Sequence, residues 1–132
     1  STGASSEKRN PTTVIGASGY RGSNNVVDTG QRDYKGRPIM MAPRAAASWK
    51  KMIAAGMPTN NGDVTNGHRD EQEYLRLKRE GYNPAANSTH NHGEGVDCHG
   101  AQGAWLRKHG AAFGWYANDY SGTHGGHYEF KG

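Results

Sequence analysis

Cysteine and long apolar runs are the two scarcest features of this sequence. Cys98 is the only cysteine among 132 residues, so the chain cannot form an internal disulfide. No apolar run approaches the length needed to cross a membrane, and no signal-peptide pattern is present. Only 33% of the residues are hydrophobic, which allows one modest core that a bound metal would help to stabilise.

Acidic residues are fewer than basic residues, whereas glycine is abundant. The formal net charge of +4 suits an anionic polymer such as cell wall or nucleic acid, and it does not distinguish the two. Twenty glycines predict many turns and long loops. The length predicts a single domain, which we expect over residues 41–132, after an irregular polar segment over residues 1–40.

The periodic patterns begin after this polar segment. The sequence predicts three helices, which cover residues 42–58, 70–81 and 101–110. It also predicts four short strands, which lie within residues 62–70, 95–98, 111–117 and 125–130. This order predicts an α+β fold with about three helices and a small, mostly antiparallel sheet.

The stretch STHNHGEGVDCHG, which begins at Ser88, concentrates candidate metal ligands. His90 and Asp97 have two glycines between them, which let the chain fold back so that both side chains can meet at one ion. A catalytic zinc site needs three protein ligands and one open position. His127, on the last predicted strand beside two glycines, is the best candidate for the third ligand.

The same stretch resembles the Ser-x-His-x-x-Gly-x-Ala-x-Asp signature of the D-Ala-D-Ala carboxypeptidase-like zinc metallopeptidases. This is the VanY and VanX group, which includes the phage L-alanyl-D-glutamate endolysins. Ser88, His90, Gly93 and Asp97 match the signature, and Gly95 stands in place of the alanine. Upstream, NGHRDEQ is similar to the family's Gly-Tyr-Arg…Gln segment, and downstream HGGHYEF resembles the Gly-Gly-His-x-Glu ending of the phage endolysins.

This resemblance implies a peptidase of the LAS/hedgehog-type DD-peptidase fold that cuts stem peptides of bacterial peptidoglycan. It implies Zn²⁺ bound by His90, Asp97 and His127, with Arg69 stabilising the tetrahedral oxyanion. Ser88 is expected to hold the substrate or a ligand through a hydrogen bond, and Gln72 is expected to contact substrate. His68 either faces the substrate or fills the loop. His92 is expected to contact substrate or solvent, with metal binding as the alternative.

One position departs from the family pattern. Many relatives carry a carboxylate three residues before the last histidine and use it as general base, whereas this chain has His124. An imidazole, with an ordinary pKa of about 6.5, can serve as the base. His124 could also be a fourth ligand or the mark of an inactive site. Asp119 and Glu129 are fallback bases, although Glu129 shares a strand face with His127 and could instead orient its ring.

Three other functions compete with this interpretation. The string HNH at residues 90–92 matches the name of a nuclease motif, but such motifs spread their residues over tens of positions, so we expect no nucleic-acid partner. A different peptidoglycan peptidase class uses a His-x-His pair that follows a separate His…Asp motif, whereas here Asp97 follows the pair. The third alternative is a catalytically inactive wall-binding module on the same fold, which His124 leaves open.

The sequence therefore predicts a zinc peptidase that acts on the cell wall, in the periplasm, outside the cell or on a virion. The Gly-Gly-His ending favours an endopeptidase over a carboxypeptidase. We expect bacterial peptidoglycan as partner, no membrane association, and a chain that belongs to a larger phage or cell-wall protein.

Overall fold

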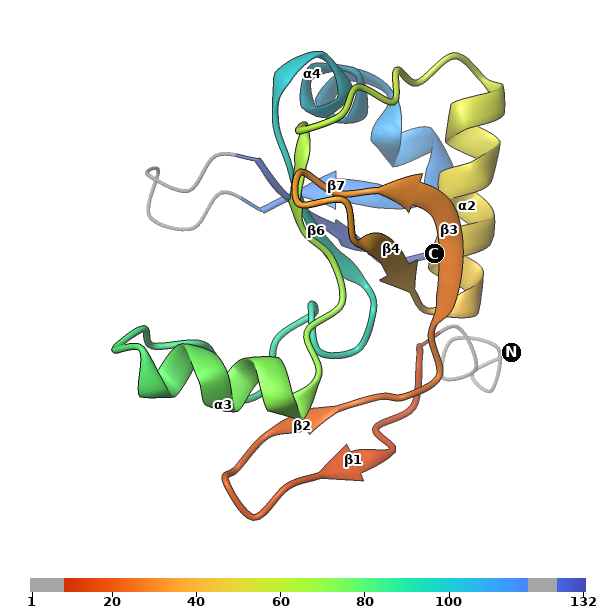
Figure 1. Cartoon of the computed structure of the whole chain (residues 1–132). Coiled ribbons are helices and arrows are strands. Elements are labelled where there is room, and N and C mark those ends of the chain that lie inside the picture. The colour runs from red at the N-terminus through yellow and green to blue at the C-terminus, as the bar shows by residue number, and fades with distance from the viewer. Residues whose placement is uncertain (1–8, 119–125) are drawn as a thin grey trace, which may run out of the picture.

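The computed structural model describes residues 9–118 and 126–132, which form an α+β protein with three α-helices and antiparallel sheets (Figure 1). In chain order the elements are β1 (Val14–Ile15), β2 (Arg21–Gly22), β3 (Val27–Arg32), β4 (Pro38–Met41), α2 (Pro43–Ala54), β5 (Val64–Asn66), α3 (Glu71–Arg79), β6 (Gly95–Cys98), α4 (Gly100–His109), the 3-10 helix η1 (Gly110–Phe113), β7 (Trp115–Ala117) and β8 (His127–Phe130). Within the described residues, no helix has both the length and the apolar character that a membrane span requires. The predicted fold class and the three predicted helices are confirmed.

A four-stranded antiparallel sheet carries the predicted ligands. Its strand order is β5-β6-β8-β7, so β6 lies between β5 and β8. The register pairs Asp97 of β6 with His127 of β8 on one side and with Asn66 of β5 on the other. Because directly opposite residues of an antiparallel pair project from the same face, the register places these three side chains together.

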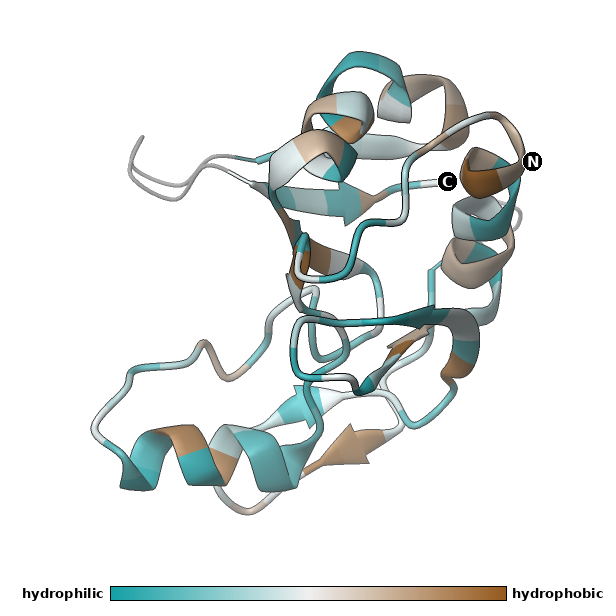
Figure 2. Ribbon diagram, turned by 45° about the horizontal axis from the view of Figure 1, so that its top comes forward, coloured by the Kyte–Doolittle hydropathy of each residue, from teal (hydrophilic) through white to brown (hydrophobic). Residues whose placement is uncertain are grey.

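The hydrophobic core lies between α2 and this sheet. The buried face of α2 includes Trp49, whose ring centroid lies 5.4 Å from that of Trp115 on β7. Cys98 is 1% exposed and belongs to the same core, which confirms its predicted burial on the face opposite Asp97. Figure 2 shows that α3, in contrast, is hydrophilic along most of its length. The core therefore supports one face of the sheet and leaves the Asp97 face for the site.

The first 40 residues contain regular structure that the sequence prediction missed. In place of an irregular segment, the described part forms two hairpins, β1 with β2 and β3 with β4. The second hairpin sends Ile39 and Met41, at most 1% exposed, into the core. It also joins a buried polar contact, in which the Trp49 indole N–H donates to Gln31 at 3.0 Å. These strands were missed because they are only two to six residues long, so no period of two stands out.

A second correction concerns residues 111–117, which were predicted to be one strand. Only Trp115–Ala117 is extended, whereas Gly110–Phe113 continues α4 as one 3-10 turn. Gly114 ends that turn with a left-handed backbone, at a φ of 89°. Phe113 packs its ring 6.0 Å from that of Trp105 on α4, so its aromatic character serves helix packing rather than a strand.

The loop that carries His90 depends on the absence of a side chain at residue 93. Gly93 has a φ of 73°, and an added Cβ would lie 2.6 Å from the backbone nitrogen of Ala42. Gly93→Ala should therefore lower the free energy of unfolding by about 2–4 kcal/mol, from left-handed strain together with overpacking. Denaturant unfolding in the presence of a chelator measures this change without a contribution from bound metal.

Gly30→Ala is the matched control for this substitution. Gly30 has a φ of 88°, but nothing lies within 4 Å of an added Cβ, so only the left-handed strain of about 1–2 kcal/mol should appear. Equal losses in the two variants would contradict the close approach of the His90 loop to Ala42.

Candidate metal centre

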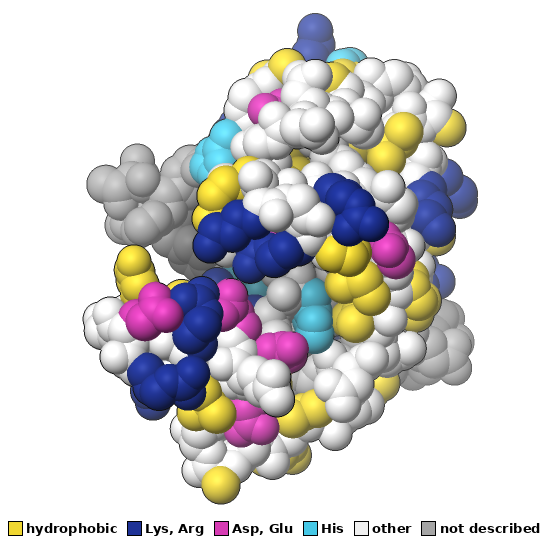
Figure 3. Space-filling view, viewed as in Figure 1, with side chains coloured by type: hydrophobic (Ala, Val, Ile, Leu, Met, Phe, Trp, Pro, Cys, Tyr) yellow, Lys and Arg dark blue, Asp and Glu magenta, His cyan; other side chains and the backbone are white. Residues whose placement is uncertain are grey.

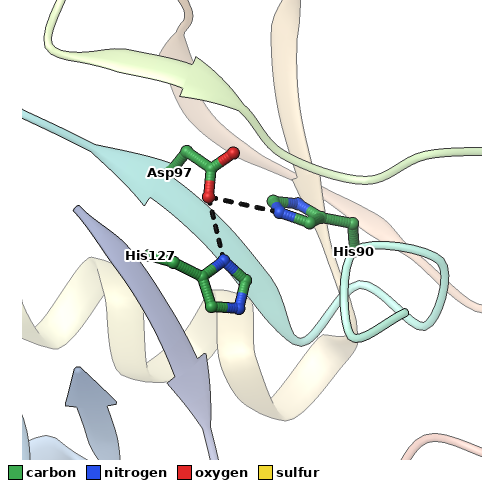
Figure 4. A group of neighbouring side chains, drawn as sticks. All are labelled: His90, Asp97 and His127. Carbon is green, nitrogen blue, oxygen red and sulfur yellow. Dashed lines mark hydrogen bonds and ion pairs between the residues drawn. The ribbon is translucent and has the colours of Figure 1, made fainter. Parts of the chain in front are cut away.

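Three segments that are distant in the sequence bring His90, Asp97 and His127 together (Figure 4). His90 lies in the loop before β6, Asp97 lies on β6, and His127 is the first residue of β8. One ligand atom from each side chain lies within 4.8 Å of the other two. Both histidines are buried, at 5% and 4% exposure, while the Asp97 side chain is 25% exposed. The predicted ligands therefore form one group that reaches solvent beside the aspartate.

His90 is held in one orientation by its neighbours. Its Nδ1 lies 2.9 Å from the carbonyl oxygen of Gly67, and since a carbonyl only accepts, Nδ1 carries the hydrogen. Nε2 is then the nitrogen that faces Asp97, and it lies 3.3 Å from Oδ1 of that carboxylate. The backbone is fixed as well, because its N–H donates to Ser88 Oγ and its carbonyl accepts from the Arg69 N–H.

His127 is oriented by a carboxylate on its own strand. Its Nδ1 lies 2.9 Å from Asp97 Oδ1, and its Nε2 lies 3.1 Å from Oε2 of Glu129. Thr89 Oγ1 lies 3.5 Å from the same Nε2. The Asn118 side chain in turn donates to Glu129 at 3.3 Å. A carboxylate on the second ring nitrogen is the usual partner of a metal-binding histidine, because it fixes the ring and raises its basicity.

Opposite charges stabilise the group without a metal. Burial alone would raise the pKa of Asp97, but hydrogen bonds from His127 and His90 outweigh it and hold that pKa far below its usual range. For His127, burial would lower the pKa, but hydrogen bonds to Asp97 and Glu129 raise it above its ordinary value. Asp97 is therefore ionised at neutral pH, with its second oxygen accepting from the Asn66 side chain at 3.0 Å.

The donor set fits a divalent metal ion. Two imidazole nitrogens and one carboxylate oxygen suit zinc, which binds such ligands at about 2.0–2.2 Å and so holds them roughly 3.3–3.5 Å apart in a tetrahedron. The His90–Asp97 separation of 3.3 Å matches this spacing, and the His127–Asp97 separation of 2.9 Å is close to it. Three ligands leave one tetrahedral position open. The buried group can therefore hold a metal ion.

Arg69, the expected oxyanion partner, lies near this group. Its side chain is half-buried, and within the described residues its guanidinium forms neither a hydrogen bond nor an ion pair. Burial lowers the pKa of this guanidinium, while the charges of Asp97 and Glu73 act in the opposite direction. The nearby Asp70 instead accepts from the Glu73 N–H and caps α3. Arg69 therefore keeps its donors free for a ligand.

Ser88 and His68 make contacts within the protein. Ser88 Oγ accepts from the N–H of His90 at 3.2 Å, so it holds the backbone of a candidate ligand. Nε2 of His68 lies 2.9 Å from the carbonyl of Ser23 and 3.1 Å from that of Asn91. Burial lowers the pKa of His68. This imidazole therefore ties the N-terminal segment to the His90 loop.

The remaining predicted residues contact another part of the protein, are exposed, or lie outside the described structure. Nε2 of His92 lies 2.7 Å from the side-chain oxygen of Asn87, and burial lowers the pKa of His92. Gln72 is exposed on α3. His124 and Asp119, the candidate bases, lie outside the described residues.

Several supporting residues escaped the sequence prediction. Asn66 contacts Asp97 because the β5–β6 register places the two opposite each other, and no sequence motif reveals a register. Gly67 contacts His90 through its backbone carbonyl, so no side chain in the sequence marks it as a supporting residue. Thr89 accounts for the glycine at residue 95, where the signature that this stretch resembles has an alanine. A Cβ at Gly95 would lie 2.3 Å from Thr89 Oγ1, so an alanine would need the space that Thr89 occupies.

The Glu129 contact predicts a measurable effect on metal affinity. We expect wild type to bind about one zinc per chain, and His90→Ala to bind little. Glu129→Ala should weaken zinc binding by about 10–100-fold, because the ring of His127 loses its carboxylate partner. Glu129→Gln keeps an acceptor oxygen and should lose less. Competition with a chromogenic chelator measures these affinities.

The control is Glu80→Ala, which removes an exposed carboxylate from the end of α3. It should leave zinc affinity unchanged. If Glu129→Ala bound zinc as tightly as this control, Glu129 would have no part in holding the metal centre.

Comparison with known proteins adds no family assignment. No protein-family model matches the chain, and no curated protein matches it with significant similarity. The resemblance to the zinc metallopeptidases therefore rests on the short motifs around His90, Asp97 and His127. The geometry of these residues and their neighbours is accordingly the basis for assigning a function.

Proposed function

We propose that this chain is a zinc metallopeptidase that hydrolyses peptide bonds in stem peptides or cross-links of bacterial peptidoglycan, on the LAS/hedgehog-type DD-peptidase fold. The observation that carries the proposal is the convergence of His90, Asp97 and His127, each with its orienting partner. These residues occupy the ligand positions of the motifs that resemble the family. The outward partners, Gly67 and Glu129, are of the kinds that metal-binding histidines use.

The residues of the chain divide the work of such a reaction. Zinc held by His90, Asp97 and His127 would supply a Lewis acid for the scissile carbonyl and would make a bound water acidic enough to ionise near neutral pH. Arg69 would stabilise the negative charge that develops on the carbonyl oxygen, since its guanidinium is half-buried, charged and unpaired within the described residues. Ser88 fixes the His90 backbone, so it acts through a ligand. We assign the role of general base to His124 from its position in the motif alone.

The wall substrate and the location also rest on the motifs. The Gly-Gly-His ending favours an endopeptidase, found in phage lysins or wall-cutting proteins, and we propose such a larger protein as the context of this chain. The +4 net charge is compatible with an anionic wall polymer. Digestion of purified peptidoglycan, with the products identified by mass spectrometry, tests the activity and names the bond that is cut.

Arg69→Ala tests the proposed oxyanion contact. It should lower kcat on a wall peptide by about 10²–10³-fold, the usual cost of removing one oxyanion donor. Zinc content and folding should remain as in wild type. Arg44→Ala, which removes an exposed arginine from α2, is the matched control and should keep full turnover. Normal turnover in Arg69→Ala would limit this arginine to a structural role.

The alternative function is a catalytically inactive wall-binding module, which His124 favours because many members of the family that the motifs resemble carry a carboxylate there. For an enzyme, His124→Ala should keep zinc and lose about 10²–10⁴-fold in kcat, the usual share of general acid–base catalysis. His124→Glu should recover part of the loss. Hydrolysis by His124→Glu but never by wild type would identify a binding module, and loss of zinc in His124→Ala would identify a fourth ligand.

A further inference from the structure

A groove lies beside the metal centre, between the β3–β4 turn and α3. It encloses a cavity of 510 Å³, and Figure 3 shows the hollow on this face, with basic side chains above it and mixed charges along α3. Its floor is the segment of residues 66–69 that joins β5 to α3. The side chains of the metal-binding group do not line the groove, so the groove lies next to the metal centre and is separate from it.

The floor of the groove also holds the metal centre in place. The Asn66 side chain donates to Asp97, and the Gly67 carbonyl accepts from His90. The backbone N–H of Arg69 donates to the carbonyl of His90. One end of a peptide bound in the groove would therefore lie next to the metal ligands.

Two exposed tyrosines line the groove. Tyr34 is 51% exposed on the β3–β4 turn, and Tyr82 is 65% exposed just after α3. They are two of the five large hydrophobic residues that are exposed in the described part of the chain. Tyrosine combines apolar area with a hydroxyl and loses little conformational entropy on contact, so it suits a binding surface.

Both tyrosines are presented by a fixed backbone. Asp33 is 7% exposed and accepts from the N–H groups of Lys35 and Arg37, which defines the turn. The N–H of Tyr34 donates to the carbonyl of Val64 on β5. The N–H of Tyr82 donates to a carbonyl of the last turn of α3. Such a surface loses little entropy when it binds a ligand.

The carboxylates of the groove are engaged within the protein. Arg37 pairs with Asp33 at 2.8 Å and with Glu73 at 3.7 Å, and Arg76 pairs with Glu73 and Glu80. Asp70, the remaining carboxylate of the lining, accepts from an N–H at the start of α3.

Two cations of the lining are not engaged in this way. Lys35 and Arg69 form no ion pair within the described residues, and the Lys35 ammonium lies 5.5 Å from the centroid of the Tyr34 ring. The charge left for an incoming group is therefore positive, which suits a carboxylate.

From these observations we infer that the groove binds the peptide of the substrate next to the scissile bond. Tyr34 and Tyr82 contact the peptide, and Lys35 binds a free carboxylate that it carries. The identity of the peptide as a wall stem peptide rests on the proposed function. The site of contact rests on the groove itself.

Steady-state kinetics on two synthetic stem peptides, one with free and one with amidated carboxylates, tests this inference. Tyr34→Ala and Tyr82→Ala should each raise KM by roughly fivefold to tenfold, the loss that truncating one contact residue commonly causes. The kcat should stay within about twofold, because the lost binding is uniform. Lys35→Ala should raise KM for the free-carboxylate peptide and leave that for the amidated peptide unchanged.

Matched controls lie outside the groove. Ile15→Ala removes an exposed apolar side chain and Lys50→Ala an exposed lysine of α2, and both should keep the wild-type KM. An unchanged KM in all three groove variants would overturn the inference. So would tyrosine effects that appear only with fragments that carry glycan, because the groove would then bind sugar.

The wild type separates this inference from the proposed function. If wild type cleaves no peptide, the proposed activity fails, and the uncut peptide can be titrated directly so that Kd replaces KM in the same comparison. A weaker Kd in the groove variants would then support the groove, and equal Kd values would overturn it.

Discussion

The antiparallel pairing of β6 with its two neighbours is the constraint on which the candidate site depends. Its register places Asp97 opposite His127 on one side and opposite Asn66 on the other. A slip of one residue would turn Asp97 into the core and bring Val96 or Cys98, both buried there, to the site face. The hydrophobic face of β6 therefore fixes the position of the ligand on the opposite face.

The connection between β5 and α3 extends this constraint beyond the sheet. Gly67 sets the tautomer of His90, the Arg69 backbone holds the same residue, and the Arg69 side chain lines the adjoining groove. Tyr20 reinforces the segment from the first hairpin by donating its hydroxyl to the Arg69 carbonyl. The candidate metal centre and the groove thus share one backbone segment, which would align a ligand bound in the groove with His90, Asp97 and His127.

The elements that the sequence predicted are those with a strong local signal. Each of the three helices has a local start or stop signal: Pro43 lies in the first turn of α2, Asp70 caps the start of α3, and Gly110 follows the end of α4. The ligand trio was predictable because two ligands lie in one short motif and the third in a terminal motif. The hairpins of the first 40 residues were not, because their strands are too short to show a period of two. Asn66 and the groove depend on register and on the packing of distant turns, which leave no pattern in the sequence.

The most direct test of the metal centre is X-ray absorption at the zinc edge on zinc-loaded protein. Binding by His90, Asp97 and His127 should give a first shell of nitrogen and oxygen at about 2.0–2.2 Å, with the outer scattering of two imidazoles and no sulfur. Cys98, the one thiol of the chain, is buried in the core, and burial raises its pKa to about 12. A sulfur scatterer at about 2.3 Å, or a shell without imidazole, would rule out His90, Asp97 and His127 as the zinc ligands.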